Sequence, residues 1–151
     1  MRVKKKAIRG SQSPKKEKGS VSDGLPEGLS SLSFAYQLAR KASRLGFDWP
    51  DLAGVFKKLD EELEEFREAL SMQNPKRVLD ELGDLLFVLV NIARFLRIHP
   101  EEALGKAVKK FTRRFDYIEA ALRKGGKNFH QSNLLEMDRL WEEAKKRQFR
   151  G

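Results

Sequence analysis

Two adjacent segments with helical apolar periodicity, residues 48–70 and 75–98, constrain the fold of this chain most strongly. In the first, apolar side chains recur every three or four residues, which is the spacing of one helix face. The second begins with Asn74 and Pro75, a capping residue and a proline at the first helical position, and is apolar on nearly all sides. Because only residues 71–74 separate the segments, we expect an antiparallel helical hairpin.

The rest of the chain also has helical periodicity. Further helices are predicted over residues 29–45, with Ser30 or Ser31 as cap, over residues 100–124, and after Asn133. The sequence contains no sustained alternation of period two and no Asn-Gly or Asp-Gly hairpin signal. We therefore expect an all-α protein, an antiparallel helix bundle of about five helices.

The apolar character of residues 75–98 bears on assembly. A helix that is apolar nearly all round must be buried, either at the centre of a domain or between subunits. A chain of 151 residues has limited means to cover such a helix by itself. We therefore expect a homo-oligomer, either a dimer with an intersubunit bundle or a tetramer.

Composition excludes several classes of protein. The chain has no cysteine, which rules out disulfides and thiolate metal sites and is compatible with a reducing cytoplasm, where we expect the protein to act. No apolar run approaches the roughly eighteen residues that a membrane-spanning helix needs, so no membrane partner is expected.

The net charge of +9 is distributed unevenly along the chain. Residues 1–20 carry eight Lys or Arg and one Glu, and they are poor in apolar residues. We predict a disordered basic tail over residues 1–24, a helical domain over residues 25–146 and a short C-terminal end over residues 147–151. The tail is interpreted either as a solubilising extension or as a contact for nucleic acid.

Acidic residues in the hairpin fall into two sets by helical phase. At about 100° per residue, Glu62 and Glu65 lie on one shoulder of the first apolar stripe, and Glu81 and Asp84 lie on the same shoulder of the second. Because the two helices of the predicted hairpin run antiparallel, these two shoulders lie on the same side of the hairpin. Their heights also agree, because Glu65 mirrors Glu81 and Glu62 mirrors Asp84 about the middle of the linker. We therefore predict one cluster of four carboxylates, with Glu61 outside it by this count.

Four converging carboxylates repel one another unless a cation neutralises them. Oxygen ligands suit Mg²⁺, with Mn²⁺ as an alternative, whereas the two histidines, His99 and His130, make zinc a poorer fit. The phase match favours a metal site. The other interpretation is a solvated flank of the helix pair, balanced by Lys and Arg.

Two pairs of residues near the C-terminal end of the chain add a further indication. Lys110 and Arg114 are four residues apart on one predicted helix, and Trp141 and Lys145 are four apart on the next. Magnesium held by carboxylates usually also binds substrate phosphates. Together these residues suggest a nucleotide polyphosphate, although each pair alone is typical of a solvated helix face or a core residue.

Several stretches resemble one known family. The segment EELEE (61–65) followed by ELGD (81–84) resembles the EExxE…ExxD signature of the MazG nucleoside triphosphate pyrophosphohydrolases. The stretches GFDWPD (46–51), PEEAL (100–104) and LLEMDRLWEEAK (134–145) are also similar to that family. The resemblance covers about residues 25 to 146 and is to the C-terminal one of two tandem domains.

This resemblance implies an all-α enzyme that uses Mg²⁺ to hydrolyse NTPs or dNTPs to the monophosphate and pyrophosphate, in house-cleaning or nucleotide-pool control. Glu61 matches a residue that orients the attacking water. The positions that match metal ligands are Glu62, Glu65, Glu81 and Asp84, which with Glu61 form the candidate catalytic set. The positions that match substrate contacts are Lys110, Arg114, Trp141 and Lys145.

Two alternatives are also compatible with the sequence. Related all-α pyrophosphatases that act on dUTP, dCTP or phosphoribosyl-ATP share the four-carboxylate motif. The other alternative is a non-enzymatic helical oligomer that binds nucleic acid through the Lys-rich tail.

Overall fold

The computed structural model describes residues 19–148, which contain five α-helices, one short 3-10 helix and no strand. This confirms the predicted all-α class. Much of the predicted tail, residues 1–18, lies outside the described residues, as do residues 149–151. The helices are α1 (Ser31–Arg44), α2 (Leu52–Ser71), α3 (Pro75–Phe95), α4 (Pro100–Lys124) and α5 (Leu134–Gln148).

Side-chain caps fix where the first three helices begin. The Ser30 hydroxyl accepts a hydrogen bond from the Ser33 amide, and Oδ1 of Asp51 accepts one from the Gly54 amide at 2.9 Å. Oδ1 of Asn74 accepts one from the Arg77 amide at 3.2 Å. Each bond satisfies a backbone donor that the first helical turn leaves free.

One helix end and one additional short helix differ from the prediction. Helix α3 ends at Phe95, three residues early, because Arg97 adopts a left-handed conformation with φ 57°. A 3-10 helix over Phe129–Gln131, which the periodicity did not predict, precedes α5 and is capped by Asn128. Such a short element carries too few residues to show a period.

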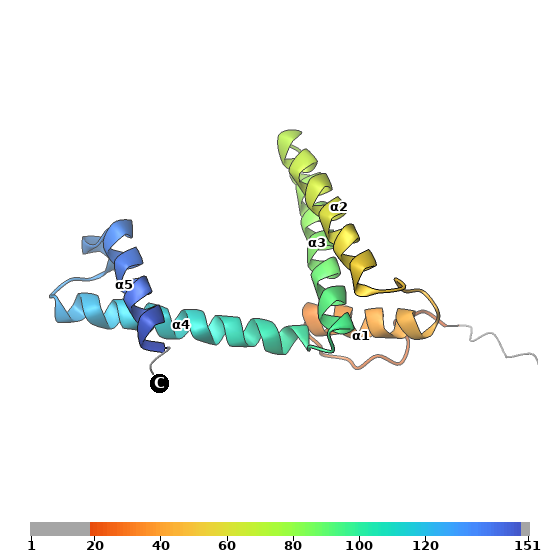
Figure 1. Ribbon diagram of the computed structural model, residues 1–151, viewed down its shortest axis with the longest axis horizontal. Helices are drawn as coiled ribbons and strands as arrows, with labels where there is room; N and C mark the ends of the chain where they lie inside the picture. The colour runs from red at the N-terminus through yellow and green to blue at the C-terminus, as the bar shows by residue number, and fades with distance from the viewer. Residues whose placement is uncertain (1–18, 149–151) are drawn as a thin grey trace, which may run out of the picture.

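The described chain forms two arms that meet at α1 (Figure 1). Helices α2 and α3 pack along each other as the predicted antiparallel hairpin. Helix α4 leaves the base of that hairpin and carries α5 against its distal half. Helix α1 contacts both α3 and α4 at the junction. Within the described residues, no helix combines the length and apolar character that crossing a membrane would require.

Each arm has its own small core, and much apolar surface remains exposed. Val55 of α2 and Val88 of α3 are buried in the hairpin, and Ile118 of α4 packs with Leu140 of α5. By contrast, α3 and α4 each keep a row of exposed apolar side chains. These are Leu79, Leu82, Leu86 and Leu89 on α3, and Leu104, Val108, Phe111 and Phe115 on α4.

Candidate metal centre

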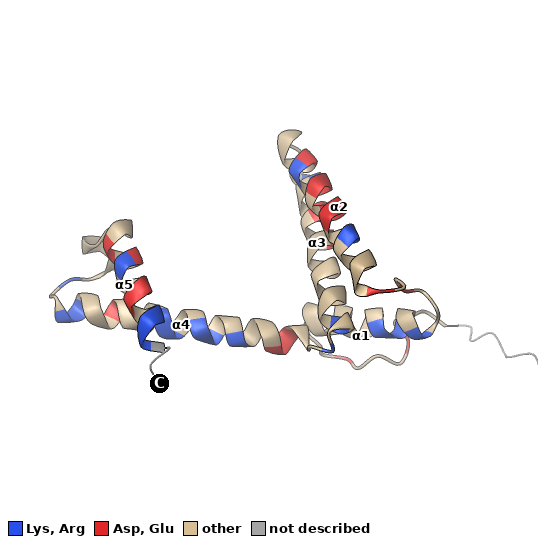
Figure 2. Ribbon diagram, viewed as in Figure 1, with Lys and Arg blue, Asp and Glu red and all other residues tan. Residues whose placement is uncertain are grey.

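Three carboxylates from the two hairpin helices converge at the middle of the hairpin. Each of Glu62, Glu81 and Asp84 offers one carboxylate oxygen, and these three oxygens all lie within 4.8 Å of one another. Glu62 comes from α2, and the other two come from α3 at positions i and i+3, which face the same side of a helix. Acidic residues are concentrated along this arm in Figure 2.

Glu62 is the most buried member of the group. Its side chain is only 7% exposed, and its Oε1 accepts a hydrogen bond from Lys58 Nζ at 2.6 Å. Its other oxygen, Oε2, is buried and has no hydrogen-bond partner among the described residues. A buried carboxylate oxygen without a partner is unfavourable, so this atom indicates a ligand position.

Two cations, Lys58 and Arg77, flank the carboxylates. Lys58 lies four residues before Glu62, and its hydrogen bond to that carboxylate raises the lysine pKa. Arg77 lies four residues before Glu81, with its Nε 3.4 Å from Oε1 of that residue. Neither residue was predicted to lie beside the carboxylates, although the i,i+4 spacing of each to a glutamate indicates such a pairing.

The electrostatics of Asp84 reflect crowding of like charges. Partial burial of its carboxyl and the nearby charges of Glu62 and Glu81 raise the pKa of Asp84, although its side chain keeps an exposed surface. Lys58 opposes this rise but does not cancel it. A cation bound beside these carboxylates would lower this pKa and favour the ionised form of Asp84.

The two other acidic candidates lie at the edge of the group. Glu65 is exposed on α2, one turn beyond Glu62, and does not belong to the set of converging oxygens. Glu61 is also exposed, and its Oε2 lies 3.6 Å from Lys58 Nζ. Three of the four predicted metal ligands thus lie together in the hairpin. Glu61 lies beside them, because Lys58 pairs with both Glu61 and Glu62.

The four candidate substrate contacts lie on the other arm. Lys110 and Arg114 belong to α4, and Trp141 and Lys145 belong to α5. The Arg114 guanidinium lies over the Trp141 ring, 5.3 Å from its centroid, and Lys145 Nζ donates to Glu142 Oε1 at 2.9 Å. This arm runs away from the hairpin (Figure 2), so one copy of the chain does not bring these residues to the carboxylates.

The chemistry of the carboxylate group suits a divalent cation. All three converging donors are oxygens, which Mg²⁺ and Mn²⁺ prefer. The unpartnered Oε2 of Glu62 and the raised pKa of Asp84 are both features that a bound cation would relieve. Glu62, Glu81 and Asp84 therefore form a candidate metal centre on an all-α hairpin.

Comparison with known proteins shows similarity to one family. Residues 51–118, which include the whole hairpin site, match the model of the MazG nucleotide pyrophosphohydrolase domain. A nucleoside triphosphate pyrophosphohydrolase/pyrophosphatase MazG of Thermotoga maritima is 43% identical over 114 residues, 76% of this chain and 44% of that protein. A nucleoside triphosphate pyrophosphohydrolase of Escherichia coli K12 is 32% identical over 143 residues, 93% of this chain and 54% of that protein.

The chain therefore carries a segment that matches the MazG domain, the family that the residues of the hairpin resemble. It spans about half the length of these curated relatives. The matched segment begins at the N-cap of α2 and ends within α4.

Proposed function

We propose that this chain hydrolyses nucleoside triphosphates, NTPs or dNTPs, to the monophosphate and pyrophosphate with the help of Mg²⁺, in cytoplasmic house-cleaning or nucleotide-pool control. The observation that carries the proposal is the buried, unpartnered Glu62 oxygen within a group of three carboxylates on a hairpin that matches the MazG domain. The curated relatives bear the name of this activity.

Glu62, Glu81 and Asp84 would hold the metal, and Glu65 would reach the same ion from its position one turn along α2. The bound ion would offset the negative charge of the triphosphate and the negative charge that develops in the transition state. Mn²⁺ offers similar oxygen coordination and is the alternative cation.

Hydrolysis would form a bond between a water oxygen and the α-phosphorus while the bond from that phosphorus to the bridging oxygen breaks. Pyrophosphate then leaves with the bond electrons. Glu61, exposed beside the group, would orient the water and accept its proton. Lys110 and Arg114 would contact phosphate oxygens, with Trp141 and Lys145 completing the substrate contacts.

We further propose that the protein is a homo-oligomer, a dimer or tetramer. The exposed apolar rows of α3 and α4 support this, because contiguous apolar surface on a folded chain indicates an interface. An oligomer would also account for the distance, within one chain, between the carboxylates and the candidate substrate contacts. A second copy would bring its own Lys110 and Arg114 to the carboxylates of the first.

Product analysis with one substitution tests the activity. Wild-type protein with ATP, GTP, dCTP or dUTP and Mg²⁺ should release the monophosphate and pyrophosphate, separated by anion exchange. Glu81→Gln should lower kcat by about a hundredfold or more and weaken Mn²⁺ binding measured by calorimetry. The matched control is Glu64→Gln, because Glu64 is exposed on the same hairpin and pairs with Arg67.

Two outcomes would contradict the proposal. Release of the diphosphate and phosphate, or no turnover of any triphosphate, would exclude the reaction. A Glu81→Gln protein as active as the control would exclude the metal assignment.

A further inference from the structure

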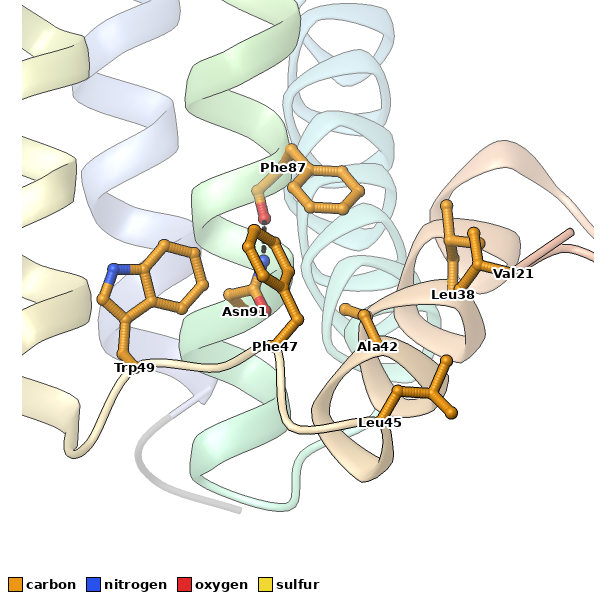
Figure 3. Close-up of a pocket in the computed structure, with 9 residues that line it drawn as sticks. Val21, Leu38, Ala42, Leu45, Phe47, Trp49, Phe87 and Asn91 are labelled. Carbon is orange, nitrogen blue, oxygen red and sulfur yellow. Dashed lines mark hydrogen bonds between the residues drawn. The ribbon is translucent and has the colours of Figure 1, made fainter. Parts of the chain in front are cut away.

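An apolar pocket of about 410 Å³ lies at the base of the hairpin, between α1, α3 and the loop that connects α1 to α2 (Figure 3). Leu38 of α1 forms one wall, and Phe87 of α3 lies above the opening. Phe47 and Trp49 of the loop stand at its front and side, with Asn91 behind them. No residue proposed for catalysis, metal binding or substrate contact lines this pocket.

The pocket continues the side of α3 that carries the carboxylates. Phe87 follows Asp84 by three residues, about 4.5 Å along the helix and about 60° around it. Asn91 follows Asp84 by seven residues, two turns and about 10.5 Å further, and nearly in phase with it. A nucleotide whose phosphates lie at Asp84, and which extends along α3 toward the base of the hairpin, would have its sugar and base beside the pocket.

The lining of the pocket suits a flat ring. Phe47 is 84% exposed and Phe87 is 40% exposed, so both rings have free surface. Nucleobases stack on such rings with little dependence on sequence because every base has a π face. Trp49 adds a third aromatic ring to the same lining.

The loop that carries two of these rings is fixed in place. Asp48, between Phe47 and Trp49, receives two hydrogen bonds from the Arg94 guanidinium of α3, at 2.9 Å to Oδ2 and 2.5 Å to Oδ1. The Ser43 hydroxyl donates to the same carboxylate at 2.6 Å. This anchoring holds the loop that carries the aromatic residues in place before a ligand arrives, which lowers the entropic cost of binding.

Polar recognition at the floor of the pocket is limited. Asn91 is 2% exposed, and its Nδ2 donates to the Phe87 carbonyl at 3.2 Å. Its Oδ1 accepts from Arg94 Nε at 3.1 Å. Because the amide oxygen and one amide hydrogen are already engaged, the floor provides stacking surface rather than a hydrogen-bonding pattern for one base.

We infer that this pocket, in addition to the proposed hydrolysis on which the inference rests, receives the nucleobase of the triphosphate by stacking and with little discrimination between bases. Phe47 and Phe87 are the positions on which the base stacks. The alternative stacking surface is Trp141 on the other arm, whose ring packs against Phe111 with ring centroids 5.3 Å apart.

Tryptophan fluorescence separates the two platforms. The chain has two tryptophans, so Trp141→Phe leaves Trp49 as the sole reporter and Trp49→Phe leaves Trp141. Adenosine and a non-hydrolysable ATP analogue should quench Trp49 saturably. Phe47→Ala, added to the Trp141→Phe protein, should weaken the affinity for both ligands about tenfold, because stacking contributes about 1–3 kcal/mol per base. Phe56→Ala, at an exposed phenyl outside the pocket, is the matched control.

Kinetics provide a second measurement. Phe47→Ala should raise KM for ATP, GTP, dCTP and dUTP alike by about tenfold while kcat changes little, and Phe47→Tyr should restore KM. Quenching confined to Trp141, or unchanged KM and affinity in Phe47→Ala, would overturn the pocket assignment. Absence of turnover in wild type would instead remove the proposed hydrolysis, and adenosine quenching of Trp49 would still report on the pocket.

Discussion

A buried carboxylate oxygen without a partner, such as Oε2 of Glu62, raises the free energy of the folded state unless a cation approaches it. The helical phase of the sequence was enough to direct Glu62, Glu81 and Asp84 toward one flank of the hairpin. It could not place Glu65, since side-chain rotamers and exposure depend on neighbours that a wheel does not contain. It also did not identify Lys58 and Arg77 as neighbours of the carboxylates.

The crowding of charge around Asp84 has a measurable consequence. Because its folded-state pKa is raised, its contribution to stability is present at low pH and is lost as the pH rises through that pKa. Without metal at pH 7, Asp84→Asn should therefore raise Tm by about 1–3 °C. Added Mg²⁺ should raise Tm of wild type more than Tm of the variant.

Differential scanning fluorimetry in EDTA and in Mg²⁺ checks this expectation. Asp116→Asn, at an exposed aspartate on α4, serves as the control and should leave Tm unchanged both in EDTA and in Mg²⁺. A lower Tm for Asp84→Asn in EDTA would show that the Asp84 carboxylate is already neutralised by the chain itself.

Asp48 shows the opposite pKa shift. Hydrogen bonds from Arg94 hold its pKa below the usual value near 3.8, and the two side chains are 22% and 10% exposed. Asp48→Asn should lower the free energy of unfolding by about 1–3 kcal/mol at pH 7. Since the folded-state pKa is depressed, that difference is present above about pH 4 and is lost as the pH falls through the folded-state pKa.

Urea unfolding at pH 7 and pH 3 measures the difference between Asp48→Asn and wild type. Asp60→Asn, at an exposed aspartate on α2, is expected to match wild type at both values. Equal stabilities of Asp48→Asn and wild type at pH 7 would mean that the Arg94 pair does not anchor the loop.

At the scale of single helices, local signals predicted the fold well. Capping residues and prolines fixed the starts of α2 and α3, and the four-residue linker fixed their antiparallel packing. The end of α3 was less predictable, because Arg97 reverses the chain in a left-handed conformation that no glycine marks. Periodicity also could not say which sides of an all-round apolar helix the chain itself would cover.

The uncovered side of α3 gives a prediction about assembly. Leu86 is 52% exposed in the middle of the exposed row of α3. Leu86→Glu would place a charge in an apolar interface, which is strongly unfavourable. Light scattering should then change from an oligomeric mass to the 17.4 kDa of one chain, while circular dichroism keeps its helical signal.

The control for Leu86→Glu is Leu29→Glu, at an exposed leucine that precedes α1. This protein should keep the oligomeric mass of wild type. A wild-type protein that is itself monomeric at micromolar concentration would refute the proposed assembly directly.

At the scale of the whole molecule, the angle between the two arms could not be predicted. The sequence indicated that Lys110 and Trp141 share a substrate with the carboxylates, but a pattern along one chain does not say which copy supplies each residue. The structure places α4 and α5 away from the hairpin. Lys110 is therefore expected to act on the carboxylate site of a second copy.

Mixing two inactive variants tests this arrangement. Glu81→Gln lacks a metal ligand, and Lys110→Ala, at an exposed position, lacks a phosphate contact. In a mixed symmetric dimer, one site combines the intact Glu81 of one chain with the intact Lys110 of the other. Equal mixing with subunit exchange should therefore recover about a quarter of wild-type pyrophosphate release, because about half of the dimers are mixed and each has one intact site.

The control mixes Glu81→Gln with a chain that carries both substitutions. No site then contains Glu81, so activity should stay at the residual level whichever chain supplies Lys110. If Lys110 acts on its own chain, every site in the first mixture lacks one of the two groups. Its activity would then not exceed the average of the two separate variants, and the arrangement between copies would be wrong.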